Sequence, residues 1–260
     1  MPRSAWYTLG FAAAICLVCS ILVTSATVSL QSRQEVNLVL DRQRNVLQAA
    51  GLLKAGESIE PAEVARRFES FEAVVVDLQT GRELPDVDPQ TVDQRKMAKD
   101  PAESHSVPTN RAQIHRVANE AVVYKLKGKD GSLEKLILPI EGKGLWGTLY
   151  GFMALAGDLE TVAGITFYEH KETPGLGGEV DNPSWKALWP GRKVYGPQGE
   201  VKLAVIKGKA GSPSDDPFKV DGLSGATITS RSVTFLLDFW LGENGFGDYL
   251  KTFSESRRAA

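Results

Sequence analysis

Asp221-Gly222-Leu223-Ser224-Gly225-Ala226-Thr227 stands directly before a predicted helix, and the interpretation of the chain begins with this stretch. After it, apolar residues recur with the spacing of one buried helical face, and a glycine ends the pattern: Val233, Leu236, Leu237, Trp240, Leu241 and Gly242. The start of a helix carries unpaired N–H groups and the positive end of the helix dipole, which suit a phosphate. Gly225 and Ala226 would let a ligand approach the backbone, and Thr227 offers a hydroxyl there.

The alternative for this stretch is a turn of small residues in which Ser224 or Thr227 caps the helix. Two further hydroxyls, those of Thr229 and Ser230, lie close by in the sequence. We expect the helix that follows the stretch to be the terminal helix of the chain.

Composition limits the classes of function that the chain can have. Its 260 residues carry a net charge of −2, so no strongly basic surface points to nucleic acid. Both cysteines lie in one hydrophobic segment, which leaves the rest of the chain without a disulfide framework. The histidines His105, His115 and His170 are scattered and form no metal-ligand pattern, so we expect no metal site.

The N-terminal segment is typical of a membrane anchor. Between Arg3 and Arg33 there is no charged side chain, and Trp6–Leu30 is long enough to span a bilayer as a helix. A cleaved signal peptide is the alternative, but the apolar run is long for one. Cys16 and Cys19 within it are expected to be packing residues. Charge alone does not favour an external C-terminus, because arginines follow the segment as well as precede it.

The remaining pattern predicts an α+β domain with a mixed or antiparallel sheet and flanking helices. Helices are expected over 36–53, 61–68 and 185–188, and strands over 71–78, 121–127, 133–140, 149–156, 162–169 and 201–207. Residues 83–112 are polar and predict a long surface excursion with a short helix over 92–98. We divide the chain into an anchor (1–32), a helical and α/β segment (33–116) and a C-terminal domain (117–260).

The opening stretch resembles the motif at which FMN is joined to threonine through a phosphoester bond. Four other stretches look like the C subunit of the bacterial Na⁺-translocating NADH:quinone oxidoreductase: Arg44–Leu47, Gly144–Gly151, Phe167–His170 and Glu172–Pro183. The resemblance implies covalent FMN on Thr227 in the C-terminal domain. The G subunit of the Rnf electron-transport complex shares the threonine motif but has a shorter chain. The sequence also leaves open a stand-alone membrane-tethered flavin module and a purely structural anchor.

The expected flavin contacts come from several stretches. Ser224, Gly225 and Ala226 would surround the phosphate, together with Lys207, whose alternative is an ordinary surface lysine. Pro174-Gly175 predicts a type II turn that presents Thr173, Leu176 and Gly177 to the ring. Glu172 would be a helper near the ring or a turn carboxylate. Trp146, between two glycines, would pack on the ring or serve as a core anchor.

The resemblance also implies a role and a place. The chain would relay electrons, one at a time, from NADH toward quinone within a multi-subunit pump that exports Na⁺. It has no glycine-rich dinucleotide fingerprint, so we expect it to bind neither NADH nor quinone, and we assign it no catalytic residue. A separate flavin transferase would load Thr227, with Asp221 as a recognition residue or, alternatively, a turn-forming aspartate. The large domain would be periplasmic, on the bacterial inner membrane.

Overall fold

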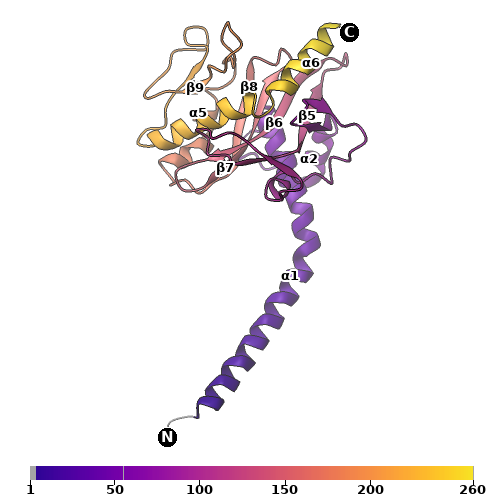
Figure 1. The fold of residues 1–260 in the computed structure, drawn as a ribbon, viewed down its shortest axis with the longest axis vertical. Coiled ribbons are helices and arrows are strands. Elements are labelled where there is room, and N and C mark those ends of the chain that lie inside the picture. Colours follow the sequence, from indigo (N-terminus) through magenta and orange to yellow (C-terminus); the bar gives the residue numbers. More distant parts are fainter. Residues whose placement is uncertain (1–3, 55, 260) are drawn as a thin grey trace. The chain divides into compact units, whose positions relative to one another are not determined.

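The computed structural model describes residues 4–54 and 56–259, and it forms two compact units, Met1–Arg42 and Gln43–Ala260. The first unit is the greater part of helix α1 (Ala5–Ala49), drawn in indigo in Figure 1. Among the described helices, α1 alone has the length and hydropathy needed to cross a membrane. The predicted N-terminal helix is confirmed. The helix ends four residues earlier than the expected end at residue 53, and Gly51, with a φ of 73°, follows its end.

The second unit is built on a six-stranded sheet in the order β2-β1-β5-β6-β7-β8, and every pairing in it is antiparallel. Its strands are β1 (Phe71–Asp77), β2 (Arg82–Glu83), β5 (Glu120–Lys127), β6 (Leu133–Lys143), β7 (Thr148–Ala156) and β8 (Val162–Glu169). The predicted hairpin between β5 and β6 is confirmed, with Tyr124 opposite Ile137. The α+β class is confirmed as well.

Helices cover the two faces of this sheet. The face that carries Leu138 and Met153 packs against α5 (Thr227–Leu241), which crosses the sheet in Figure 1. The last turns of α1 lie on the opposite face, where the side chains of Val46 and Leu47 are fully buried. The alternation of side chains along each strand produces these two apolar faces.

Glycines allow both helices to approach the sheet closely. A Cβ atom on Gly142 of β6 would lie 2.6 Å from the Cβ atom of Leu236 in α5. On the other face, a Cβ atom on Gly164 of β8 would meet the carbonyl oxygen of Ala49. Neither position has room for a side chain, so the packing distance of both helices depends on glycine.

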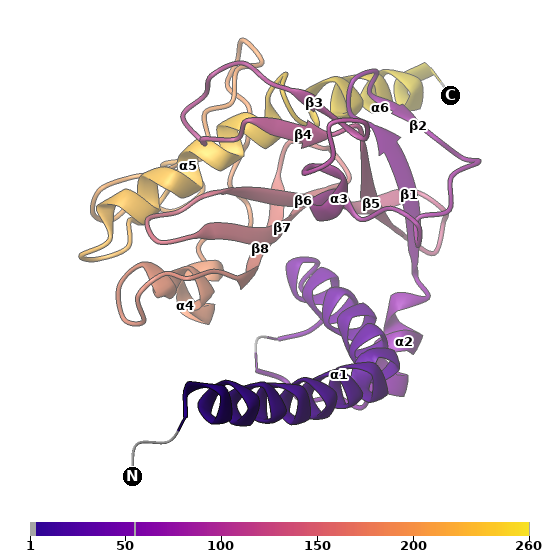
Figure 2. The same ribbon diagram turned by 60° about the horizontal axis from the view of Figure 1, so that its bottom comes forward.

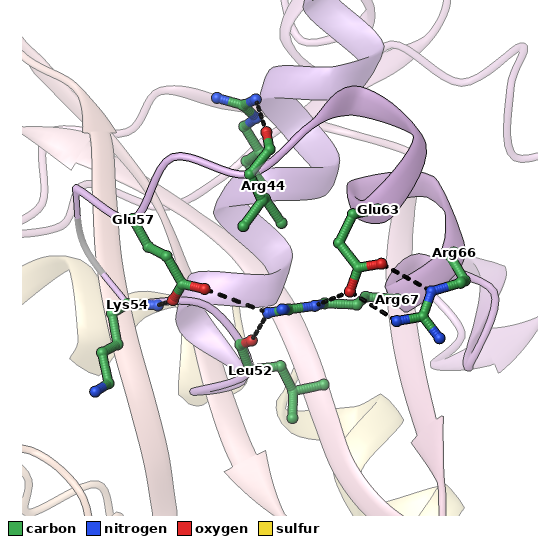
Figure 3. A network of polar contacts seen from close by, with 8 residues as sticks. Arg44, Leu52, Lys54, Glu57, Glu63, Arg66 and Arg67 are labelled. Atoms are coloured by element: carbon green, nitrogen blue, oxygen red, sulfur yellow. Dashed lines mark hydrogen bonds and ion pairs between the residues drawn. The ribbon is translucent and has the colours of Figure 1, made fainter.

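A polar network secures the segment that joins α1 to α2 (Pro61–Phe68), as Figure 3 shows. The Arg67 guanidinium donates to the Glu63 carboxylate at 2.7 Å and to the Leu52 carbonyl at 3.0 Å. The Arg44 guanidinium donates to the Ile59 carbonyl at 2.9 Å. These bonds satisfy carbonyl groups of an irregular segment that has no sheet partner.

The second half of the chain departs from the prediction in two places. The strand expected over 201–207 is only β9 (Ala204–Val205), because its parallel partner β10 (Lys219–Val220) is equally short. Helix α5 is not the last helix, since α6 (Gly247–Ala259) follows it. Helix α6 was not predicted, because only a few of its side chains face the core and many of the others are charged.

The remaining elements are short. The polar excursion contains α3 (Gln94–Met97), as expected, and also a strand pair that the sequence did not suggest, β3 (Ser104–Ser106) with β4 (Arg116–Ala118). The 3₁₀-helix Gly177–Asp181 leads into α4 (Pro183–Lys186), which begins two residues before the predicted helix. Figure 2 shows α4 close to the edge strand β8.

We expect Gly142→Ala to destabilise the protein by about 1–3 kcal/mol, because the new methyl group overlaps Leu236 and must push α5 away from β6. Thermal unfolding of the detergent-solubilised full chain measures the change. Gly128→Ala is the matched control, since its nearest obstacle is the end of an exposed side chain, the Asp130 carboxylate at 2.9 Å, and not a packed helix. Equal stability of the two variants would contradict the close packing of α5.

Candidate flavin site

The motif forms a turn that leaves the start of α5 open. Gly225 has a φ of 72°, and Ala226 occupies the N-cap position without any side-chain hydrogen bond. Ser224 and Thr227 are exposed, and neither caps the helix, so the alternative of a simple side-chain cap is wrong. The N–H groups of the first turn of α5 therefore remain available to a ligand such as a phosphate.

The three hydroxyls of the first turn have different surroundings. Thr227 is exposed at the first position of α5. Thr229 is 1% exposed and donates to the Glu172 carboxylate at 2.5 Å. Ser230 is 4% exposed and accepts from the N–H of Leu223 at 3.0 Å. Thr227 is thus the accessible threonine of this turn.

The Thr173–Leu176 segment forms the predicted turn. Gly175 has a φ of 73°, and the N–H of Leu176 donates to the Thr173 carbonyl at 3.1 Å, as in a type II turn. Its tip is exposed, and Leu176 reaches the motif. A Cβ atom on Gly225 would lie 2.8 Å from a methyl carbon of Leu176. The turn and the start of α5 are therefore in direct contact.

Glu172 joins this turn to two other segments. Its side chain is almost fully buried, at 5% exposed, and one carboxylate oxygen accepts from the N–H of Trp146 at 2.9 Å. The other oxygen accepts from Thr229. Gly144 and Gly177 border the carboxylate so closely that a Cβ atom on either would lie 2.6 Å from it.

Apolar side chains around this carboxylate are exposed. Trp146 is 64% exposed and Leu145 is 43% exposed, both in the turn between β6 and β7. Leu176 is 44% exposed and Ile228, beside Thr227, is 55% exposed. The alternative of Trp146 as a core anchor is therefore wrong. Exposed apolar side chains on neighbouring segments are typical of a binding site.

Asp221 and Lys207 lie at the other end of the motif. The Asp221 carboxylate accepts from the N–H of Ala210 at 2.9 Å, so it stabilises a neighbouring loop and does not cap its own turn. The N–H of Gly222 donates to the Gly208 carbonyl at 2.8 Å, which places the Lys207 loop alongside the motif. Lys207 is exposed, and no hydrogen bond joins its side chain to Thr227 within the described part of the chain.

Four residues of this region were not predicted from the sequence as parts of it: Thr229, Gly144, Leu145 and Ile228. A signal existed for Thr229, because it lies one helical turn before the buried Val233 and so shares the inward face of α5. The closeness of Gly144 to Glu172 had no comparable signal, since it depends on the fold.

One half-buried carboxyl with a shifted pKa lies on strand β6, shortly before the turn that carries Trp146. Burial raises the pKa of Glu141, on β6, to about 6, and attraction by Arg95 and Lys99 opposes this only in part. The raised pKa means that ionisation of Glu141 costs free energy in the folded state. That cost is absent below the ordinary pKa of 4.5 and fully present above about 6.

We therefore expect Glu141→Gln to stabilise the protein by about 2 kcal/mol above pH 7 and to have little effect near pH 4. Thermal unfolding of the full chain as a function of pH measures the difference. Glu243→Gln, at an exposed carboxylate, is the control and should show no such window. A constant difference between Glu141→Gln and the parent at all pH values would contradict this assignment.

Known proteins resemble the chain over nearly its whole length. The FMN-binding domain family matches residues 144–242, which include the Trp146 turn, Glu172 and all of α5. The C subunit of the Na⁺-translocating NADH-quinone reductase of Pseudomonas aeruginosa is 49% identical over 247 residues, covering 94% of each chain. The Yersinia pestis C subunit is 44% identical and covers 95% of this chain and 92% of its own. The crystal structure of Shewanella oneidensis NqrC matches with a TM-score of 0.74 and 33% identity, covering 83% of this chain and 97% of that one.

The fold and the matched region define a flavoprotein with an FMN-binding domain and an N-terminal apolar helix that fits a single-pass membrane anchor. More narrowly, the chain belongs to the family of the C subunit of the Na⁺-translocating NADH-quinone reductase, an oxidoreductase complex of several subunits. The near-complete coverage also favours this family over the shorter Rnf protein.

Proposed function

We propose that this chain carries FMN joined to Thr227 through a phosphoester bond and relays electrons from NADH toward quinone, coupled to Na⁺ export. The observation that carries the proposal is the exposure of the Thr227 hydroxyl at the open start of α5. Thr229 and Ser230 are buried and hydrogen-bonded, which makes them unsuitable as attachment points. The membership in the C-subunit family supports the role.

The residues present fit a tethered flavin. The open N–H groups of α5 suit the phosphate, with Ser224, Gly225 and Ala226 beside it. The exposed side chains of Trp146 and Leu176 suit the faces of an aromatic ring. Thr173 is exposed in the same turn, whereas Gly177 is buried behind it and would act only by leaving space. Lys207 adds a positive charge near the motif. The flavin would supply the redox chemistry, and the chain would supply position and electrostatics.

Attachment requires a second enzyme. A threonine hydroxyl is a weak nucleophile unless a base activates it, and no such base contacts Thr227 in the described residues. A flavin transferase would supply the flavin as a phosphoanhydride. The bond from the Thr227 oxygen to the flavin-bearing phosphorus would form and the anhydride P–O bond would break. The other phosphate-bearing fragment would leave with the bridging oxygen, and the hydroxyl proton would pass to a base of the transferase. Asp221 orders a loop beside the motif, which suits a recognition role.

Membership in the C-subunit family supports a proposal for the partners and the location. The chain would assemble with the other membrane and peripheral subunits of the pump, and one of them would bind NADH and another quinone. It would not bind nucleic acid, in keeping with its net charge of −2. Residues 1–32 would anchor it in the bacterial inner membrane, with residues 33–116 and the flavin domain of residues 117–260 in the periplasm. The isolated chain would not oxidise NADH.

We expect Thr227→Val to abolish covalent flavin while the domain stays folded, because valine keeps the shape of the exposed side chain and lacks the hydroxyl. Mass mapping of peptides after co-expression with a flavin transferase locates the FMN. Ser224→Ala, which removes a neighbouring exposed hydroxyl, should leave the attachment intact. FMN found on Thr229 or Ser230 would refute the assignment.

If the large domain is periplasmic, an alkaline phosphatase fused after Ala260 should be active and a fluorescent protein fused there should not, because one membrane-spanning helix separates the two ends of the chain. Paired fusions of an alkaline phosphatase, active in the periplasm, and a fluorescent protein, active in the cytoplasm, measure this. Cytoplasmic activity would overturn the periplasmic placement.

A further inference from the structure

Glu172 is a buried carboxylate whose charge has no cation partner. It is 5% exposed, and no salt bridge in the described part of the chain includes it. Its two oxygens accept one N–H bond and one O–H bond, and neither donates. Both oxygens of Glu172 therefore act as acceptors, and the hydroxyl bond of 2.5 Å is short.

Its position is central to the proposed flavin site. One oxygen bonds the backbone of Trp146, the other bonds the first turn of α5 two residues after Thr227, and Glu172 itself precedes the turn that presents Leu176. The two segments that supply ring contacts and the helix that supplies the tether are thereby joined by one side chain.

A purely structural role does not require the charge. A glutamine in this position could accept from the Trp146 N–H with its oxygen and donate to the Thr229 hydroxyl with its amide. Burying a carboxylate without a cation costs more free energy than burying an amide. The presence of glutamate in this place therefore indicates a use for the charge itself.

We propose that Glu172 is a positioning residue of the flavin site and that its uncompensated negative charge lowers the reduction potential of the flavin held there. The proposal rests on the attachment of FMN at Thr227. A fixed negative charge disfavours the addition of electrons to a nearby ring, and the effect is stronger where water is excluded. The carboxylate is shielded from water by the segments that Gly144 and Gly177 allow to close around it.

Glu172→Gln separates the charge from the positioning. In the FMN-loaded full chain, we expect the flavin that is bound to have a midpoint potential shifted to a more positive value. Glu255→Gln, which removes one exposed charge on α6, is the matched control and should leave the potential unchanged. Spectroelectrochemical titration measures the potentials, and in-gel flavin fluorescence measures the content. Equal potentials for the two variants would overturn the electrostatic role.

Glu172→Ala tests the positioning. Without the carboxylate, the N–H of Trp146 and the hydroxyl of Thr229 lose their shared partner, so we expect the flavin absorbance spectrum to move toward that of free FMN. An absorbance spectrum identical to the parent's would overturn the positioning role. If the alanine variant fails to fold, Thr229→Val, which removes the hydroxyl that bonds Glu172, tests the same point with the same readout. Absence of FMN from the parent chain would instead overturn the proposed function and this proposal together.

Discussion

The hydrogen bonds of the buried Glu172 carboxylate are the constraint on which the candidate site depends. They tie the turn after β6, the turn after β8 and the first turn of α5 to one point. Each of these segments is irregular or a helix end, so none has sheet partners to fix its position. Both bonds are buried, and losing either partner would leave a polar group unsatisfied.

The rest of the domain makes this convergence possible through close packing. Helix α5 lies near enough to β6 that Gly142 has no space for a side chain, and the indole N–H of Trp240 donates to the Glu141 carbonyl at 2.6 Å. These contacts fix where α5 begins relative to the ends of β6 and β8. The apolar residues left exposed there, Trp146 and Leu176 among them, then border an accessible threonine.

A tethered cofactor and an open site are physically compatible. A covalent bond removes the need for a deep pocket, because the cofactor cannot dissociate. The exposed position of Thr227 and its apolar neighbours fits a ring that remains accessible to partner proteins. This matches the requirements of an electron carrier within the family to which the chain belongs.

The sequence alone determined the local features of this protein. Periodicity predicted α1, α2, the strands from β5 to β8 and the helix after Thr227, because these depend on propensity and on alternating burial. The Pro174-Gly175 pair predicted its turn for the same local reason. Only the tertiary structure decided that Trp146 is exposed, that Thr229 is buried and that both bond Glu172. It also decided the short length of β9 and the presence of α6, since each depends on a partner distant in the sequence. The residue pattern predicts which side of a helix or strand is apolar. It does not predict that the turn after β6, the turn after β8 and the first turn of α5 converge on the Glu172 carboxylate, because that depends on how the helices and strands pack.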